Sequence, residues 1–199
     1  MKPVRRDFLI ELPKPELHCH LDGSLRLETM LDLAQKDKVE LPAKDLDGLK
    51  KAVVVQNRVK SLEEYIEKFQ FTLAVLQTPE ALERAAFELA EDAAAENVRH
   101  LEVRYSPILH KDKGMTPMES LDAVIKGLRD AEHEFNISTG VIICGIRNFS
   151  IESSIELAEL AIAYKYRGVI GYDLAGQKKI SQPRIILKPS ISFGITISM

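Results

Sequence analysis

Three polar residues that could bind a metal ion or exchange a proton lie within five positions of one another near the start of the chain: His18, His20 and Asp22. The stretch 16–21 is apolar at alternate positions and is closed by Asp22 and Gly23, which predicts a short strand that ends in a turn. Side chains two positions apart on a strand project from the same face. The two imidazoles are therefore expected side by side, where both can reach one metal ion at about 2 Å. A His-x-His pair also occurs without a metal, so position and context must decide between a ligand pair and two ordinary histidines.

The sequence favours structural roles for the remaining candidate side chains. The sequence predicts that His110, among charged neighbours, is a solvated loop residue and that His100 lies at the amino end of a strand, away from any site at the carboxyl end. His133 is expected on the polar face of a helix. Arg104 is expected to pair with an acid. Both cysteines, Cys19 and Cys144, are expected to pack rather than to bind a metal.

Strands and helices alternate along the chain and must position these groups. Apolar runs predict strands at 16–21, 101–105, 137–146 and 169–173, and amphipathic stretches predict helices at 25–36, 61–76, 79–97, 117–135 and 151–166. This order is typical of a parallel α/β fold, in which ligands bind at the carboxyl ends of the strands. Periodicity alone leaves two architectures open, an open doubly wound sheet and a (β/α)8 barrel.

The character of the sequence changes after Gly176. Residues 177–199 contain no Asp or Glu, and they show neither a helical period nor a capping signal. The expected organisation is one α/β unit over 1–176, followed by a divergent tail over 177–199 that is not clearly part of the fold.

Composition excludes several classes of function. The 199 residues are 45% hydrophobic and 29% charged, with a net charge of -3, which is ordinary for a globular domain and gives no reason to expect nucleic acid or an anionic membrane as a partner. No run of about 20 apolar residues predicts a membrane span. With two cysteines and no secretory signal pattern, a reducing cytoplasm is the expected compartment. Composition leaves the oligomeric state open.

Three strings carry a resemblance to a known family. LPKPELHCHLDGS at 12–24 closely resembles the first barrel strand of adenosine deaminases, and the same family carries EVRYSP and DLAG strings, found here at 102–107 and 173–176. The three occur in the family's order with suitable separations. The resemblance covers about residues 8–176, and the combination of motifs is more specific than any one of them.

The resemblance implies a fold and a reaction. The fold is expected to be an incomplete (β/α)8 TIM barrel of about the first four βα units, with a helical insertion after the first strand. His18 and His20 resemble zinc ligands, and His20, Asp22 and Gly176 resemble contacts to a purine nucleoside. The implied reaction is the zinc-dependent hydrolytic deamination of adenosine to inosine and ammonia, in which a zinc ion activates the attacking water.

The chain also departs from the family pattern. The family takes a third histidine, a proton-shuttling glutamate, another histidine and paired aspartates from later strands. This chain has no histidine after His133 and no Asp or Glu after Asp173. No catalytic residue can therefore be identified, and the isolated chain is expected to be inactive. Two alternatives stay open: a deaminase of another amino-purine, such as adenine or a modified nucleoside or nucleotide, and a non-catalytic binding variant of the family.

Overall fold

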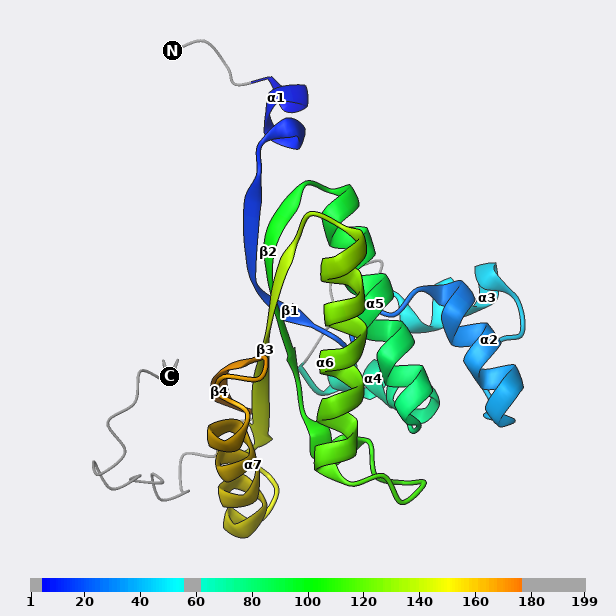
Figure 1. Ribbon diagram of the computed structural model, residues 1–199. Helices are drawn as coiled ribbons and strands as arrows, with labels where there is room; N and C mark the ends of the chain where they lie inside the picture. The colour runs from blue at the N-terminus through cyan, green and yellow to red at the C-terminus, as the bar shows by residue number, and fades with distance from the viewer. Residues whose placement is uncertain (1–4, 56–61, 177–199) are drawn as a thin grey trace.

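The computed structural model describes residues 5–55 and 62–176, and for residues 62–67 the backbone alone. Helices alternate with four strands, and a helical insertion follows the first strand (Figure 1). The elements follow in this order: α1 Arg6–Glu11, β1 Lys14–His20, α2 Leu27–Asp37, α3 Leu46–Val53, α4 Leu62–Val75, α5 Pro79–Ala95, β2 Val98–Tyr105, the short 3-10 helix η1 Pro107–Leu109, α6 Pro117–Glu134, β3 Ser138–Ile146, α7 Ile151–Ala163 and β4 Val169–Ala175. The predicted tail at 177–199 lies outside the described residues.

The strands form one parallel sheet in the order β1-β2-β3-β4. Its register places His20 beside Arg104 on β1 and β2, and Cys144 beside Asp173 on β3 and β4. Because all the strands run in the same direction, their carboxyl ends meet along one edge of the sheet, which is where α/β proteins place their sites.

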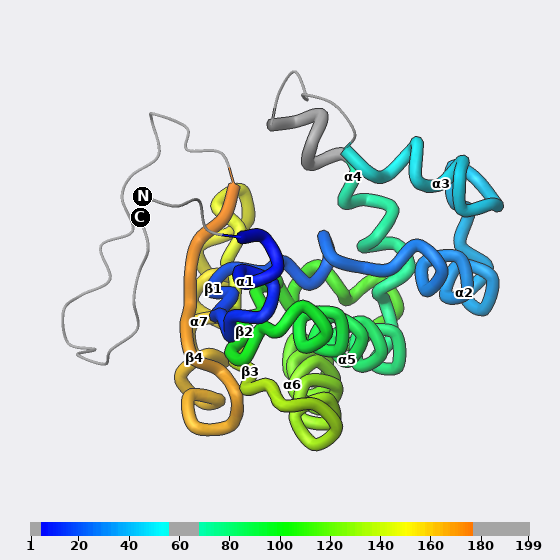
Figure 2. The backbone as a smooth tube through the Cα atoms, turned by 90° about the horizontal axis from the view of Figure 1, so that it is seen from above, coloured from blue at the N-terminus to red at the C-terminus, as the bar shows by residue number. Residues whose placement is uncertain are grey.

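Helices α5 and α6 lie side by side against the sheet, and α7 packs near β3 and β4 (Figures 1 and 2). The core between them is apolar and fully buried, and includes Leu82, Leu101, Val103, Leu121, Val124, Leu128 and Ile143. Helices α2, α3 and α4 form the insertion after β1, and α2 and α3 lie farther from β4 than α5 does (Figure 2). The predicted α/β alternation and the helical insertion are both confirmed.

Capping residues explain where the two central helices begin. Thr78 caps α5 by accepting a hydrogen bond from the Ala81 amide, and Pro79 takes the first helical position. Helix α6 begins with a complete capping box, in which Thr116 and Glu119 satisfy each other's backbone amides. The two helices that cover the sheet are therefore positioned by signals that are visible in the sequence.

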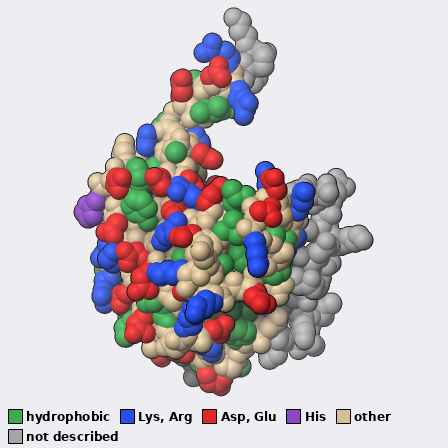
Figure 3. Space-filling view, turned by 90° about the vertical axis from the view of Figure 1, so that its right-hand side faces the viewer, with side chains coloured by type: hydrophobic (Ala, Val, Ile, Leu, Met, Phe, Trp, Pro, Cys, Tyr) green, Lys and Arg blue, Asp and Glu red, His purple; other side chains and the backbone are tan. Residues whose placement is uncertain are grey.

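The helical face of the molecule carries charges of both signs. Figure 3 shows Lys and Arg side chains interspersed with Asp and Glu over this face. Ion pairs join the start of α2 and α2 itself to α5: Arg26 binds Glu91 and Asp92, and Arg84 binds Asp32. Arg84 also pairs with Glu88 within α5. Within the described part of the chain, no helix combines the length and the apolarity needed to cross a membrane.

Candidate functional site

The two histidines predicted as a pair lie together at the carboxyl end of β1. The centroids of the His18 and His20 rings are 5.2 Å apart, and the rings are tilted by 53°. His18 is exposed, and 39% of the His20 side chain is accessible. The strand thus presents two neighbouring imidazoles to the space beyond the end of the sheet.

Asp22 lies directly beyond β1, and its side chain is almost fully buried. Its Oδ1 atom is 3.8 Å from Nδ1 of His20 and has no hydrogen-bond partner among the described residues. Burial raises the pKa of the Asp22 carboxyl to about 6, although its backbone hydrogen bonds and the charge of Arg104 act in the opposite direction. An unpartnered buried carboxylate oxygen is costly and calls for a ligand or an ordered water.

Arg104 connects all four strands near their carboxyl ends. From β2, its Nε donates to Asp173 Oδ2 on β4 at 2.6 Å, one terminal nitrogen lies 3.2 Å from His20 Nε2 on β1, and the other donates to Cys144 Sγ on β3 at 2.7 Å. Only 8% of the Arg104 side chain is exposed. The predicted pairing of Arg104 with an acid is confirmed, and that acid is Asp173.

This cluster determines the charge state of His20. Burial, together with the electrostatic effects of Arg104 and His18 and against that of Asp173, lowers the pKa of its imidazole to about 4. At neutral pH His20 is therefore an uncharged imidazole, the form that binds a metal. Burial also raises the pKa of the Cys144 thiol to about 12, so that this sulfur remains protonated.

Gly176 follows β4 at the same edge of the sheet. Its φ of +99° lies in the region that favours glycine, and the residue is exposed. A Cβ placed there would meet the Arg147 side chain and backbone at ordinary contact distances of 3.6 and 3.7 Å. It is therefore the backbone conformation, rather than crowding by neighbours, that favours glycine at this position.

The other histidines lie away from this cluster. His100 is near the amino end of β2, where Nδ1 lies 2.9 Å from Ser138 Oγ, and His133 is exposed on α6; both lie where they were expected. The prediction for His110 is wrong. Only 1% of that residue is exposed, because η1 turns the chain back so that Nδ1 meets Leu76 O at 2.7 Å.

Sequence reasoning missed the cluster formed by Arg104, Cys144 and Asp173 as a unit. A signal was present, because Arg104 and Asp173 interrupt apolar strands close to their carboxyl ends. Neither charge indicates its partner by itself, because the two residues become neighbours only through the order of the strands in the sheet. Among the described residues, no group of three or more His, Cys, Asp and Glu side chains is arranged to hold a metal ion.

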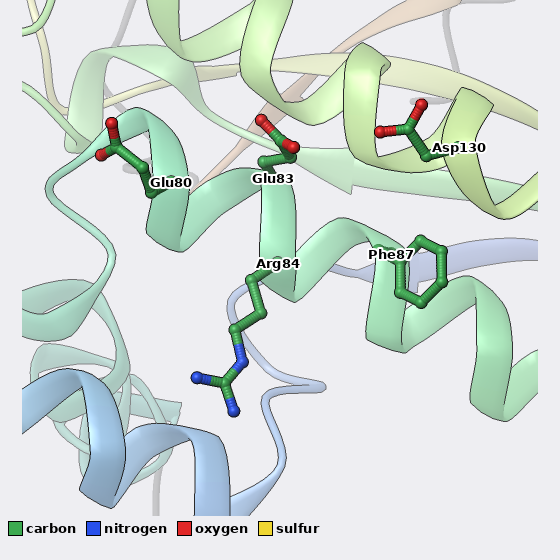
Figure 4. A pocket seen from close by; sticks show the side chains of 5 residues that line it. All are labelled: Glu80, Glu83, Arg84, Phe87 and Asp130. Carbon is green, nitrogen blue, oxygen red and sulfur yellow. The ribbon is translucent and has the colours of Figure 1, made fainter.

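A shallow pocket elsewhere on the molecule does not share any residue with this cluster. It lies on the outer surface of α5 and α6 and is lined by Glu80, Glu83, Arg84, Phe87 and Asp130 (Figure 4). Arg84 points away from the carboxylates of Glu83 and Asp130 and towards α2, where it pairs with Asp32. The pocket has no convergent polar groups that would suggest chemistry.

Comparison with known proteins identifies the relatives of this chain. The sequence model of the adenosine deaminase family matches residues 13–197. The adenosine deaminase of Clostridium perfringens strain SM101 is 46% identical over 168 residues, which cover 84% of this chain and 51% of that protein. The adenosine deaminase of Clostridium botulinum strain 657 is 40% identical over 192 residues, which cover 95% of this chain and 58% of that protein. The chain thus spans about half the length of the curated relatives it matches.

Solved structures show the same relationship. An amidohydrolase from Burkholderia ambifaria with bound zinc matches with a TM-score of 0.78 and 26% identity, over 91% of this chain and 50% of that one. The adenine deaminase of Arthrobacter aurescens matches with a TM-score of 0.72 and 28% identity, over 83% and 49% of the two chains. Arabidopsis ADAL in complex with GMP matches with a TM-score of 0.72 and 30% identity, over 85% and 51%.

These matches decide between the two architectures that periodicity left open. The four parallel strands and their helices correspond to about half of a (β/α)8 barrel deaminase rather than to an open doubly wound sheet. Since the family match covers nearly the whole sequence and close relatives align over most of it, the chain belongs to the adenosine deaminase family.

Proposed function

We propose that this chain supplies the metal-binding and nucleoside-binding half of a zinc-dependent deaminase that hydrolyses adenosine to inosine and ammonia. The observation that carries this proposal is the pair of neighbouring imidazoles, His18 and His20, at the carboxyl end of β1. They lie beside Asp22, whose Oδ1 atom has no hydrogen-bond partner among the described residues. Family membership supports the reaction class, namely hydrolytic loss of an amino group.

The separation of the two histidine rings is compatible with one shared zinc ion. An imidazole nitrogen about 2.1 Å from zinc places its ring centroid about 3.2 Å from the ion, so two ligands at the tetrahedral angle have centroids about 5.2 Å apart. The observed separation is 5.2 Å. The low pKa of His20 keeps its ring neutral, as a ligand must be. The residues present therefore fit zinc as far as two ligands can.

In the proposed site, His18 and His20 would hold the zinc ion. The chemistry that a bound zinc ion would supply is a water molecule of lowered pKa, the nucleophile that the reaction needs. Asp22 accepts a hydrogen bond from a ribose hydroxyl through its free Oδ1, and His20 lies beside the same ligand. Gly176, which has no Cβ, lets the backbone approach the purine ring.

A complete catalytic centre needs more groups than these residues supply. A catalytic zinc ion takes three or more protein ligands, and a proton must reach the purine ring during attack. The sequence contains no histidine after His133 and no Asp or Glu after Asp173. We infer that deamination needs further donors in addition to those in these 199 residues.

A second candidate substrate class follows from the solved relatives. Proteins of similar fold include an adenine deaminase and Arabidopsis ADAL crystallised with GMP or IMP. An amino-purine base or a nucleotide is therefore the alternative to adenosine. The buried Asp22 favours a ligand that carries a ribose, because a free base offers no hydroxyl to its unpartnered oxygen.

Zinc and nucleoside binding by the purified 199-residue chain test the proposal. Equilibrium dialysis with zinc is expected to show one weak site, which His18→Gln and His20→Gln abolish and His133→Gln leaves intact. Ligand-observed NMR with adenosine, inosine, adenine and AMP then ranks the ligands, and Asp22→Asn is expected to weaken the binding of nucleosides but not of adenine. Zinc binding that is unchanged in both histidine variants would contradict the proposal.

A further inference from the structure

We propose that two copies of this chain associate edge to edge, with β4 of each copy against β1 of the other, and so close a parallel eight-stranded barrel. The partner that fits the open sheet is thus a second copy of the chain. The inference is independent of the proposed function, because a second copy brings the same side chains and none of the missing catalytic donors.

The first observation concerns the backbone at the two ends of the sheet. Within residues 5–55 and 62–176, β1 and β4 are each paired along one side only. The N–H and C=O groups on the other side of each strand are therefore available to a further strand. Both ends of the sheet can be extended by a parallel strand.

The second observation is that exposed apolar side chains gather at these same two ends. We call the two clusters the β1 patch and the β4 patch. The β1 patch consists of Phe8, Leu9, Ile10, Leu12 and Leu17, and the β4 patch consists of Phe149, Ile151, Ile155, Ile162 and Ile170. Together they hold ten of the fifteen large apolar side chains that are exposed among the described residues. Single exposed apolar residues are ordinary, whereas clusters mark interaction surfaces.

Each patch includes a helix that presents apolar side chains to the outside. Helix α1 buries none of its residues and stands beyond the amino end of the sheet (Figure 1). On α7, Ile151, Ile155 and Ile162 are separated by four and seven positions, so they share one face of the helix. A partner that adds a strand to either edge would also cover one of these helices.

The curvature of the sheet indicates how much of a barrel is missing. The chain superposes with a TM-score of 0.78 on 50% of the zinc-bound Burkholderia amidohydrolase. Its four parallel strands therefore follow half of the circumference of a (β/α)8 barrel. A second half of the same curvature and strand number completes the circle.

The symmetry of the pairing follows from the difference between the two edges. Pairing β4 with β4, or β1 with β1, across a two-fold axis would make those strands antiparallel and would leave the other patch exposed. Pairing β4 with β1 keeps all strands parallel and brings unlike patches together. Such a head-to-tail contact closes into a ring when the rotation between copies divides the circle. A half-barrel corresponds to a rotation of one half-turn, so the ring closes at two copies with two identical interfaces.

Light scattering coupled to size-exclusion chromatography tests the closed dimer on the 199-residue chain. The mass is expected to reach twice that of one chain and to remain there as the concentration rises further. Hydrogen exchange is expected to show that the backbone amides of β1 and β4 become more protected as the dimer forms. Neither measurement needs a substitution, so both stand even if an edge variant fails to fold.

Single substitutions at the two edges test which strands pair. Leu17→Lys changes the β1 edge and Ile170→Lys changes the β4 edge. Each is expected to raise the dimer dissociation constant by about tenfold or more, because every β4–β1 interface then buries a charge. Met118→Lys, an equally exposed apolar position on α6, is expected to leave the dissociation constant unchanged.

Mixing the two edge variants provides the sharpest comparison. In a mixed dimer, β4 of the Leu17→Lys chain meets β1 of the Ile170→Lys chain, and this interface contains no substitution. The equimolar mixture is therefore expected to form more dimer than either variant alone at the same total concentration.

A chain that stays monomeric at the highest concentration overturns the proposal and leaves the edges to a different partner. A mass that grows without limit overturns closure at two copies. A dimer that is weakened by only one of the two edge variants overturns the pairing of β4 with β1. Zinc and nucleoside are absent from all these measurements, so the proposed function is tested separately.

Discussion

Arg104 and Asp173 place opposite charges inside a sheet whose strands are otherwise largely apolar. The two groups are 2.6 Å apart, and each side chain is at most 10% exposed. Desolvating such a pair costs about as much as its attraction returns, so the pair is weak support for stability as a whole. Removing one partner is different, because it leaves an uncompensated charge in the interior.

Asp173→Ala is therefore expected to lower the free energy of unfolding by about 3–5 kcal/mol, since the Arg104 guanidinium loses its only carboxylate partner among the described residues. The double variant Arg104→Met, Asp173→Leu is expected to recover a large part of this loss. Urea denaturation at pH 7 measures both. Lys126→Ala, which breaks an exposed pair with Glu83 and Asp130, serves as the control and is expected to have no measurable effect. Equal losses in the single and double variants would contradict this account.

His110 makes the stability of the chain depend on pH. Burial lowers the pKa of its imidazole from 6.5 to about 4 in the folded state. Between these values the unfolded chain binds the proton and the folded chain does not, so stability is complete above pH 6.5 and falls as the pH drops towards 4. The loss from this one group amounts to about 3 kcal/mol at most.

His110→Asn removes the titrating group while keeping an N–H that can reach the Leu76 carbonyl oxygen. Its free energy of unfolding is expected to fall less steeply than that of the wild type between pH 7 and pH 4. Urea titrations at several pH values compare the two slopes. His133→Asn changes an exposed histidine and is expected to reproduce the wild-type slope. Parallel slopes for the wild type and His110→Asn would show that the buried ring does not titrate as described.

The sequence allowed the paired histidines to be predicted but not their surroundings. His18 and His20 are adjacent because a strand has a period of two, which is a local property. The partner of His20, by contrast, is Arg104 on β2, 84 positions away along the chain, and Arg104 is held in turn by Cys144 on β3 and Asp173 on β4. Burial of His110 depends in the same way on a contact with Leu76, 34 positions earlier. Local polarity predicted a solvated residue there, and a long-range contact overrode it.

Helices whose ends are marked by capping residues were predicted well. Helix α6 was expected at 117–135 and spans Pro117–Glu134, because Thr116, Pro117 and Glu119 together define its start. Helix α3 lay in a region that sequence patterns did not resolve. It has only eight residues, contains Gly48 and buries Leu49 alone, so it offers few positions over which a helical period can be recognised. Its start is instead set by Asp45, whose side chain accepts a hydrogen bond from the Gly48 amide.

Close packing of α5 on α6 depends on Gly127. A Cβ at this position would lie 2.1 Å from the carbonyl oxygen of Glu83 on α5, a backbone atom that cannot move without shifting the helix. Gly127→Ala gains about 1 kcal/mol of helix propensity, but the clash is expected to outweigh it and leave a net loss of about 2 kcal/mol. Thermal unfolding followed by circular dichroism measures the difference. Glu134→Ala on the exposed end of the same helix controls for propensity, and a stabilised Gly127→Ala variant would show that the helices are farther apart.

The four-stranded sheet presents two open edges in the described part of the chain. β1 and β4 each pair on one side only, and both carry exposed apolar side chains, with Leu17 54% and Ile170 44% accessible. Unpaired strand edges invite association with other chains. The matched solved relatives are about twice as long, which is consistent with such edges being covered in a complete barrel.

The 199-residue chain is therefore expected to self-associate as its concentration rises. Leu17→Lys combined with Ile170→Lys places a charge on each edge and is expected to shift the chain towards the monomer, as measured by size-exclusion chromatography with light scattering. Met118→Lys changes a side chain that is 53% exposed on α6, away from either edge, and is expected to leave association unchanged. An equal effect of Met118→Lys would mean that general surface hydrophobicity, not the strand edges, drives association.

The proposed function would need more donors than this chain supplies, so catalysis is a test at the scale of the whole molecule. In the proposed site, His18 and His20 supply two zinc ligands, yet the sequence offers no Asp or Glu after Asp173 to shuttle a proton. Two ligands leave the ion weakly held, and general acid–base catalysis contributes about 10²–10⁴-fold to rates of this kind. The purified chain with added zinc is expected to convert adenosine to inosine no faster than His18→Gln in a spectrophotometric assay of ammonia release. Turnover that exceeds that of His18→Gln and is abolished by a chelator would show that the residues present already form a working centre.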